Sequence, residues 1–230
     1  MNIALYGGTF DPVHRGHLAV AQAAQQQFDL RQVWFVPAYI SPLKQRQPVA
    51  PLIHRYAMLA LATQEKDGFL PSLMEAPAAL GGAAPDGGGP SYTLDTVLRF
   101  KRRLAKRDRL FFMLGIDAFL DIGKWHESEA LLRAVEFIVV SRPGFSLAEA
   151  AGALPQGIRP KPAAPTGRRG AGDIVVPGAT VHLLEGVHER LSATQVRIAA
   201  ARGGSLTRQV GPAVAAYIRK LHLYRSGEPG

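Results

Sequence analysis

The chain has 230 residues, of which 47% are hydrophobic, so it is long enough to bury the core of one sizeable domain. It has no cysteine, no run of about 18 apolar residues and no signal-peptide pattern, so disulfides, thiolate chemistry and a membrane-spanning helix are excluded and a cytoplasmic location is expected. The formal net charge of +9 favours anionic partners, nucleic acid and nucleotides alike.

Strand-like and helix-like segments alternate along the chain. The expected strands are 2–6, 33–36, 69–74, 110–114, 137–140 and 181–184, and the expected helices are 17–28, 52–63, 93–106, 192–202 and 210–221. Strands that alternate with helices are typical of a parallel sheet with helices on both faces. We therefore expect an α/β fold with an open parallel sheet, closed at its C-terminal end by the last two helices.

Two segments interrupt this alternation. Residues near 81–89 are glycine-rich, and residues 155–172 are rich in proline, glycine and arginine. Both compositions are typical of flexible connections, although the arginines also allow the second to act as a basic arm over an anionic ligand. No second domain is evident, so we predict a single domain over residues 1–225.

The first candidate site follows the first expected strand, where residues 7–17 read Gly-Gly-Thr-Phe-Asp-Pro-Val-His-Arg-Gly-His. Ligands of open α/β sheets bind at the carboxyl ends of strands, and phosphates lie against the following helix N-terminus. Gly7 and Gly8 allow a polyanion to approach the backbone. His14 and His17 share one face of the first helical turn. This stretch predicts a phosphate-binding site.

The second candidate site begins at Ser192, where Ser192 and Gln195 form a capping box. The uncapped amides of that helix start favour an anion, and Arg197 adds a planar fork of donors one turn later. In the loop after the second strand, Lys44 is a further cation within reach of a phosphate. Arg55 is another candidate, but we expect each of these two residues, taken alone, to be a solvent-exposed charge.

Three further segments carry polar or aromatic groups that could contact a ligand. Residues 91–96 start a helix at which Thr93 is a candidate cap, and Asp117 follows the 110–114 strand. Trp125 offers an aromatic surface for stacking, although its sequence context taken alone favours a place in the core, and His126 follows it.

These motifs resemble those of one enzyme family. Residues 7–17 resemble the GxFDPxHxGH signature of the nucleotidyltransferase superfamily. Residues 192–197 resemble the SxTxxR motif of the same superfamily. Residues 91–96 and 114–125 resemble the SYTxDT and LGxDxxxxxxxW patterns of bacterial nicotinate-nucleotide adenylyltransferases. The resemblance spans 7–197 and implies a Rossmann-like fold. It also implies a reaction: ATP and nicotinate mononucleotide give nicotinate adenine dinucleotide and pyrophosphate, with Mg²⁺ bridging phosphate oxygens.

The resemblance also assigns roles to residues. It implies that His17 contacts the α-phosphate in the transition state, that His14 contacts the phosphates beside it, and that Arg197 takes the leaving pyrophosphate. The residues expected to bind ATP are Gly7, Gly8, Thr9, Phe10, Gly16, Lys44, Ser192 and Thr194. Those expected to bind nicotinate mononucleotide are Thr93, Asp117, Trp125 and His126. No protein metal ligand is expected, and Asp11 is expected to orient the turn.

Alternatives remain at this point. Nicotinamide mononucleotide is the closest rival substrate, and only the region of Thr93 and Trp125 argues against it. Other adenylyltransferases of the superfamily, such as those acting on phosphopantetheine, share the first signature. A basic nucleic-acid-binding protein is the alternative of a different class. It is disfavoured because the basic clusters at 101–109 and 159–169 have few aromatic residues near them.

Overall fold

The computed structural model describes residues 1–39, 49–82, 91–141, 147–158, 173–176, 178–187 and 191–225. Seven strands among them have the order β3-β2-β1-β4-β5-β7-β6. The contacts divide the chain into two compact units, which are described separately. The first unit comprises Met1–Tyr6, Ala23–Arg31 and Tyr92–His188, and the second comprises Gly7–Gln22, Gln32–Ser91 and Glu189–Gly230.

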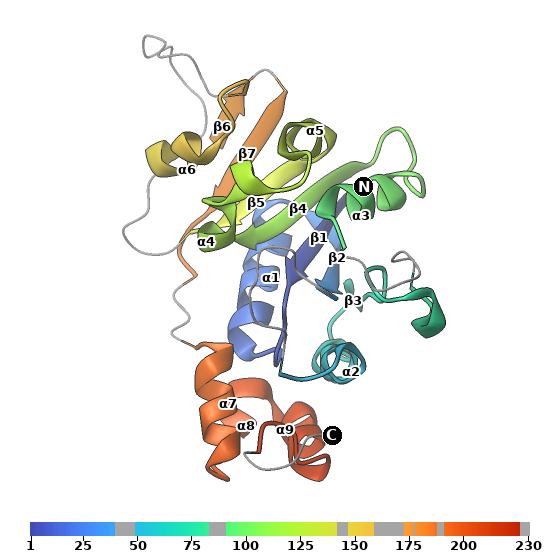
Figure 1. The fold of residues 1–230 in the computed structure, drawn as a ribbon, viewed down its shortest axis with the longest axis vertical. Helices are drawn as coiled ribbons and strands as arrows, with labels where there is room; N and C mark the ends of the chain where they lie inside the picture. Colours follow the sequence, from blue (N-terminus) through green and yellow to red (C-terminus); the bar gives the residue numbers. More distant parts are fainter. Residues whose placement is uncertain are drawn as a thin grey trace. The chain divides into compact units, whose positions relative to one another are not determined.

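Parallel strands form the centre of the first unit (Figure 1). They are β1 (Asn2–Gly8), β4 (Arg109–Gly115), β5 (Glu136–Val140) and β7 (Ala179–Leu184). Four to five consecutive residues of β1 and β4 are buried, as expected of parallel strands covered on both faces. The pairing of β1 with β4 runs from Asn2 opposite Arg109 to Tyr6 opposite Met113, so both strands end at the same edge.

Short helices lie between these strands along the chain, and two of them pack against the strands. Among them, α4 contacts β4 and β5, and α5 contacts α3, β5 and β7. Their bounds are α3 (Thr93–Lys101), α4 (Ile116–Phe119), η2 (Ile122–Lys124), α5 (Ser128–Ala134) and α6 (Leu147–Ala153).

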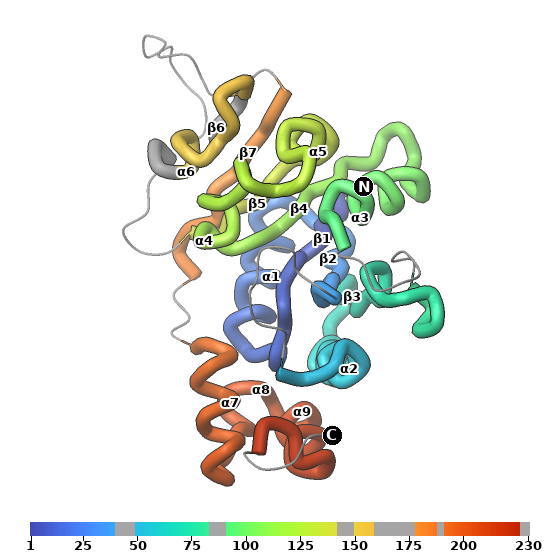
Figure 2. The backbone as a smooth tube through the Cα atoms, in the orientation of Figure 1, coloured from blue at the N-terminus to red at the C-terminus, as the bar shows by residue number. Residues whose placement is uncertain are grey.

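The second unit contains a parallel strand pair and a group of helices. The pair is β2 (Leu30–Pro37) and β3 (Phe69–Pro71), with Val33 opposite Phe69. Helix α2 packs against β3 and α9, and α8 packs against α9. Figure 2 shows α7, α8 and α9 together in orange and red. The helices are α1 (Arg15–Gln27), which contributes to both units, α2 (Leu52–Thr63), η1 (Ala78–Leu80), α7 (Ala193–Ala201), α8 (Thr207–Val210) and α9 (Pro212–Lys220).

The α/β class, the parallel sheet and the closing helices are confirmed, with corrections to single elements. Strand β6 (Asp173–Val176), which was not expected, pairs antiparallel with β7. The helix predicted over 93–106 ends at Lys101, because the carboxylate of Asp108 accepts the Ala105 amide and holds a turn there. The strand predicted over 69–74 ends at Pro71, where the hydroxyl of Ser72 accepts the Met74 amide.

The two predicted flexible segments lie mostly outside the described residues. At the first, Gly81 has a φ of 75° and ends η1. At the second, the Ile158 amide closes a turn onto the Pro155 carbonyl. The single domain over 1–225 stays a prediction.

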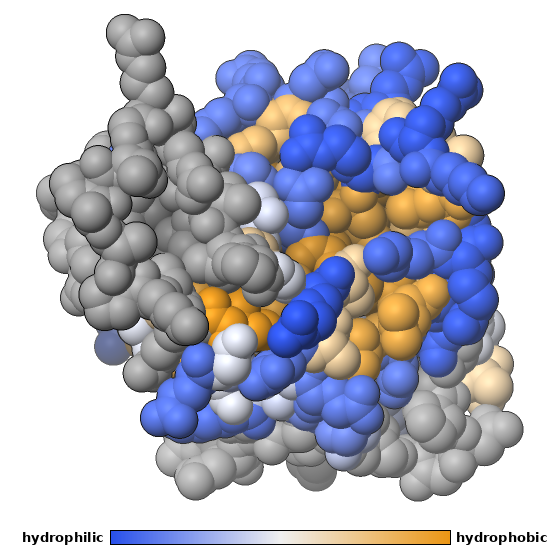
Figure 3. Space-filling model, turned by 90° about the horizontal axis from the view of Figure 1, so that it is seen from above, coloured by the Kyte–Doolittle hydropathy of each residue, from blue (hydrophilic) through white to orange (hydrophobic). Residues whose placement is uncertain are grey.

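Polar and apolar residues alternate on the face drawn in Figure 3, where apolar residues form several separate areas. Within the described part of the chain, no helix is long and apolar enough to cross a membrane.

Candidate active site

The loop after β1 is built around a buried phenylalanine. Phe10 has a φ of 48° and is 1% exposed, with its ring edge-on to Phe35 at 5.7 Å and to His17 at 5.0 Å. A Cβ atom on Gly8 would lie 2.9 Å from that ring. Gly8 is therefore required to admit the Phe10 ring, and only the backbone of Phe10 is left for a ligand. The Gly8 carbonyl also accepts the Ala38 amide at 2.9 Å.

Three other residues expected at ATP lie in the same unit as this loop. Gly7 is half-buried near the end of β1, Thr9 is half-buried, and Gly16 is buried in the first turn of α1. Lys44 lies outside the described residues.

The two histidines stack at the start of α1. Their ring centroids are 3.7 Å apart with an interplanar angle of 26°. The backbone amide of His14 donates to Nδ1 of His17 at 3.2 Å, so Nδ1 is the acceptor and the proton of a neutral His17 ring lies on Nε2. Nδ1 of His14 is buried and has no hydrogen-bond partner among the described residues.

Burial also sets the charge of both rings. It lowers the pKa of His14 to about 4. Burial, assisted by the neighbouring His14, lowers the pKa of His17 well below its usual value. Both imidazoles are therefore neutral at pH 7, and His17 presents an Nε2–H donor rather than a cation.

Asp11 ties the loop to three distant segments. Its Oδ2 accepts the Val49 amide at 2.8 Å, and its Oδ1 accepts the Ala50 amide at 3.2 Å and the Tyr224 hydroxyl at 2.8 Å. Its backbone carbonyl accepts Nη1 of Arg197 at 2.7 Å. The carboxylate thus holds the loop in place, which is the geometry of an orienting residue.

Arg55 corrects the sequence analysis, which expected a solvent-exposed charge. The residue is 1% exposed, and its guanidinium donates to three backbone carbonyls. Nε donates to Ala50 at 3.0 Å, and Nη1 donates to Thr9 and to Ala38 at 2.8 Å each. Burial lowers the pKa of Arg55, while the nearby Asp11 carboxylate opposes that shift. Arg55 is therefore a buried cation that holds the loop after β1 through its hydrogen bonds to backbone carbonyls.

The N-terminus of α7 has the predicted capping box. The Ser192 hydroxyl accepts the Gln195 amide at 3.2 Å, and the Gln195 side chain accepts the Ser192 amide at 3.1 Å. One turn further along the helix, the guanidinium of Arg197 makes two hydrogen bonds. Nη1 donates to the Asp11 carbonyl, and Nη2 donates to Oγ1 of Thr194 at 3.0 Å. The structure thus brings Arg197 to the loop after β1, across 186 residues of sequence.

The residues expected at the mononucleotide lie in the first unit. Thr93 is the first residue of α3, and the N-cap is Tyr92, not Thr93, with no side chain capping the helix. The Tyr92 ring stacks on His126 at 4.1 Å. Trp125 is half-buried and edge-on to Phe112 at 6.4 Å, and its Nε1 is buried without a partner among the described residues.

The last of these residues, Asp117, is exposed in the first turn of α4, immediately after β4. Among the described residues, neither the indole nitrogen of Trp125 nor the N-terminus of α3 has a side-chain hydrogen-bond partner.

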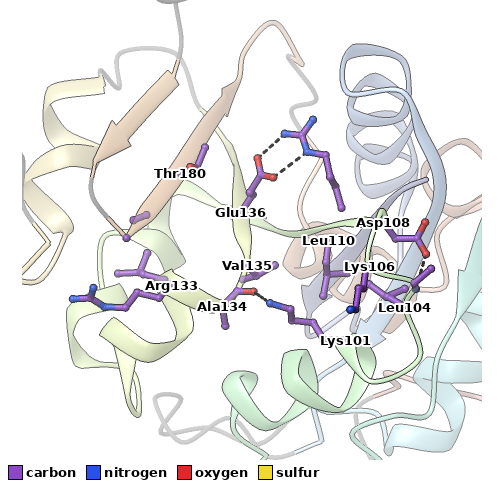
Figure 4. A pocket seen from close by; sticks show the side chains of 15 residues that line it. Lys101, Leu104, Lys106, Asp108, Leu110, Arg133, Ala134, Val135, Glu136 and Thr180 are labelled. Carbon is purple, nitrogen blue, oxygen red and sulfur yellow. Dashed lines mark hydrogen bonds and ion pairs between the residues drawn. The ribbon is translucent and has the colours of Figure 1, made fainter.

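A cavity of about 610 Å³ lies where β4, β5 and β7 begin (Figure 4). Three of its four cationic side chains have partners: Arg109 forms two hydrogen bonds to Glu136, and Lys101 donates to the Ala134 carbonyl at 2.6 Å. Arg133 lies 3.6 Å from Glu129. Because ligands of parallel sheets bind where strands end, we assign no nucleotide to this cavity.

Sequence reasoning missed Tyr224, and it named Arg55 as a candidate but expected its side chain to be exposed. The inward orientation of Arg55 depends on its tertiary surroundings, and no motif marks Tyr224, which reaches Asp11 from the end of the chain. Among the described residues, no group of three or more His, Asp or Glu side chains is arranged to hold a metal ion.

Comparison with known proteins identifies the family. Residues 5–199 match the family described as cytidylyltransferase-like. The chain is 38% identical over 225 residues to a probable nicotinate-nucleotide adenylyltransferase of Thermus thermophilus, covering 98% of this chain and 100% of that protein. The chain therefore belongs to the cytidylyltransferase-like family and, within it, to the nicotinate-nucleotide adenylyltransferases. The nicotinate-nucleotide adenylyltransferase of Bacillus subtilis is 41% identical over 143 residues, which cover 62% of this chain and 70% of that protein.

A solved structure has a similar architecture. The nicotinic acid mononucleotide adenylyltransferase of Plasmodium falciparum, in a complex with NaAD, matches with a TM-score of 0.66 at 19% identity, covering 97% of each chain. At that identity the likeness supports the Rossmann-like fold that the family resemblance implied.

Proposed function

We propose that the chain transfers the adenylyl group of ATP to nicotinate mononucleotide, giving nicotinate adenine dinucleotide and pyrophosphate in NAD biosynthesis. One observation carries the proposal: Arg197 and the α7 N-terminus are fastened through Asp11 to the loop that presents His17. These connected segments carry three kinds of donor: the neutral N–H of His17, the guanidinium of Arg197 and the backbone amides at the N-terminus of α7. Together these donors suit a triphosphate. The names of the full-length relatives supply the acceptor.

The reaction needs no general base. A phosphate oxygen of the mononucleotide, already ionised at neutral pH, attacks the α-phosphorus of ATP, and the bond from that phosphorus to the bridging β-phosphate oxygen breaks. Catalysis then depends on positioning and on stabilising charge. We assign His17 Nε2–H to an α-phosphate oxygen, His14 to the adjoining phosphates, and Arg197 with the amides near Thr194 to the departing pyrophosphate.

A divalent metal bound with ATP fits this site. The Asp11 carboxylate is occupied by two amides and a phenol, so it is not free to bind a metal ion. We therefore propose that Mg²⁺ is held by phosphate oxygens and water. When bound, it neutralises part of the triphosphate charge.

The preference for nicotinate over nicotinamide is assigned to the start of α3. The helix has no side-chain cap, so the amide of Thr93 and those after it are available to a carboxylate, which the positive helix end favours over a neutral amide. Trp125, with the stacked Tyr92 and His126, offers aromatic surface for the pyridine ring. Asp117 is the fourth residue proposed for this ligand. The cytoplasmic location stays a prediction.

An assay of pyrophosphate release tests the proposal. The protein is given ATP and Mg²⁺ with nicotinate mononucleotide, nicotinamide mononucleotide or phosphopantetheine in parallel. We expect the highest kcat/KM with nicotinate mononucleotide and no turnover with phosphopantetheine. The variant His17→Ala controls for contaminating activity. A higher kcat/KM with nicotinamide mononucleotide would reject the assigned acceptor, and no turnover with any acceptor would reject the reaction.

A further inference from the structure

The end of the chain brings a phenol to the loop after β1. The hydroxyl of Tyr224 donates to Oδ1 of Asp11 over 2.8 Å, across 213 residues of sequence. Asp11 is 4% exposed and Tyr224 is half-buried, so this contact is largely shielded from solvent. Tyr224 lies beyond residues 5–199, which match the cytidylyltransferase-like family, and no motif of the sequence includes it.

Asp11 connects this phenol to the phosphate-binding groups. Its carboxylate has three donors, of which the Tyr224 hydroxyl at 2.8 Å is nearer to Oδ1 than the Ala50 amide at 3.2 Å. Its carbonyl holds Nη1 of Arg197 at 2.7 Å. A change in the position of Asp11 therefore moves the acceptor to which Arg197 is bound.

The backbone before the phenol adopts a costly conformation. After α9 ends at Lys220, His222 has a φ of 53° and Tyr224 has a φ of 67°, both in the left-handed region that side chains other than glycine rarely adopt. The Leu223 amide closes this turn onto the Ile218 carbonyl at 3.0 Å. Such conformations persist where surrounding contacts hold them, and they cluster at functional sites.

The Tyr224 hydroxyl stays protonated, so it can always act as a hydrogen-bond donor. Burial, together with the adjacent Asp11 carboxylate, raises the pKa of Tyr224 above its usual value. The hydroxyl therefore keeps its proton over the whole working range of pH, and its bond to the carboxylate is charge-assisted.

We propose that Tyr224 is a positioning residue for ATP: its hydroxyl holds Asp11, and through Asp11 it holds the guanidinium of Arg197. The inference rests on the proposed function, because it assigns Arg197 to the phosphates of ATP. The last turn of the chain is then part of the active site, although it touches no substrate.

The test compares Tyr224→Phe with Tyr217→Phe. Both changes remove only a hydroxyl, and that of Tyr217 lies 2.9 Å from Nδ1 of His54, away from Asp11. In the pyrophosphate assay, we expect Tyr224→Phe to lower kcat/KM for ATP about tenfold while the KM for nicotinate mononucleotide stays within twofold. Tyr217→Phe should leave both values near those of the unchanged protein.

A purely structural role gives a different pattern. If Tyr224 were only structural, Tyr224→Phe would have a lower Tm and a smaller active fraction, with no selective change in kcat/KM for ATP. That result would overturn the inference. The double variant Asp11→Asn, Tyr224→Phe adds a second check, because residues acting through one contact have non-additive effects. Additive losses would also reject the inference.

The dissociation constant of ATP, measured by titration calorimetry without an acceptor, separates this inference from the proposed function. If the unchanged protein binds ATP but adenylates no pyridine mononucleotide, the proposed function fails. The inference then stands or falls on whether Tyr224→Phe alone weakens ATP binding about tenfold. An ATP affinity and a kcat/KM both equal to those of the unchanged protein would overturn it.

Discussion

Among single residues, His17 has the most defined chemical state, because the His14 amide fixes which ring nitrogen carries the proton. A neutral donor aimed at developing charge is worth much more in the transition state than in the ground state. We expect His17→Ala to lower kcat by ~10²–10³, the loss typical of one transition-state donor.

His17→Gln is the matched variant, since its amide N–H lies near the place of Nε2–H and should recover part of the lost kcat. Steady-state kinetics with Tm as a folding check decide the matter. Near-normal turnover of His17→Ala would remove the role assigned to this ring.

Arg55 gives a prediction about stability. Arg55→Met leaves the buried carbonyl of Ala50 and the partly buried carbonyls of Thr9 and Ala38 without their donor, and a lost hydrogen bond of this kind costs about 1 kcal/mol, so we expect a loss of up to about 3 kcal/mol. The control Arg208→Met removes an exposed guanidinium in the same unit and should cost less than about 0.5 kcal/mol. Urea unfolding measures both, and equal midpoints for the two variants would contradict the account.

The sequence was sufficient for residues whose local pattern carries the information. The capping box of Ser192 and Gln195 is confirmed, because both partners lie within one helical turn. The burial of Arg55 was not predictable, since an arginine early in a helix is usually solvated and its three acceptors come from different segments.

At the scale of elements, the N-terminus of α7 is the part most open to test. Ser192→Ala removes the cap and should cost about 1 kcal/mol of stability. It also frees the first turn to reorient, so we expect KM for ATP to rise several-fold. Ser205→Ala, an exposed serine in the same unit, is the matched control. If unfolding and kinetics show both variants alike, the cap has no role in either property.

The helices also show which element boundaries a sequence can predict. The helix expected over 52–63 is confirmed with those bounds as α2, where no charge run complicates the apolar pattern. The helix expected to reach Lys106 stops at Lys101, where two effects act together: the turn that Asp108 holds, and the repulsion at helical spacing among the six cationic residues from Lys101 to Arg109 inclusive. The short, antiparallel β6 has too few residues for a pattern to show.

For the whole molecule, the buried histidines predict how stability depends on pH. The pKa of His14 is about 4 in the folded protein against an ordinary value of 6.5, so protons favour the unfolded chain between these values. Stability should be constant above pH 6.5 and fall towards pH 4, by about 3 kcal/mol at most for His14. Denaturant unfolding at pH 7, 6 and 5 measures the slope.

The variant His14→Gln should flatten this slope, since it removes one of the groups that titrate. Glu136 does not interfere in that window. The hydrogen bonds from His182 and Arg109 lower its pKa to about 2, so its contribution is lost only below its ordinary value of 4.5. An unchanged slope in His14→Gln would show that His14 is not the group responsible.

Long-range contacts are the part of the molecule that no local pattern contains. The motifs at 7–17 and 192–197 were each interpreted as part of a phosphate site, which stays a proposal, but neither motif predicted that Asp11 joins the two segments through Arg197. The contact of Tyr224 with Asp11 spans almost the full chain and required the fold to be seen.

The most direct test of adenylyl transfer follows a phosphorus label from ATP into the products. The protein is incubated with nicotinate mononucleotide and Mg²⁺, and with ATP labelled at either the α- or the γ-phosphorus. Attack at the α-phosphorus predicts that the α label appears in nicotinate adenine dinucleotide and the γ label in pyrophosphate. Transfer of the γ label to the mononucleotide, or no transfer of either label, would contradict it.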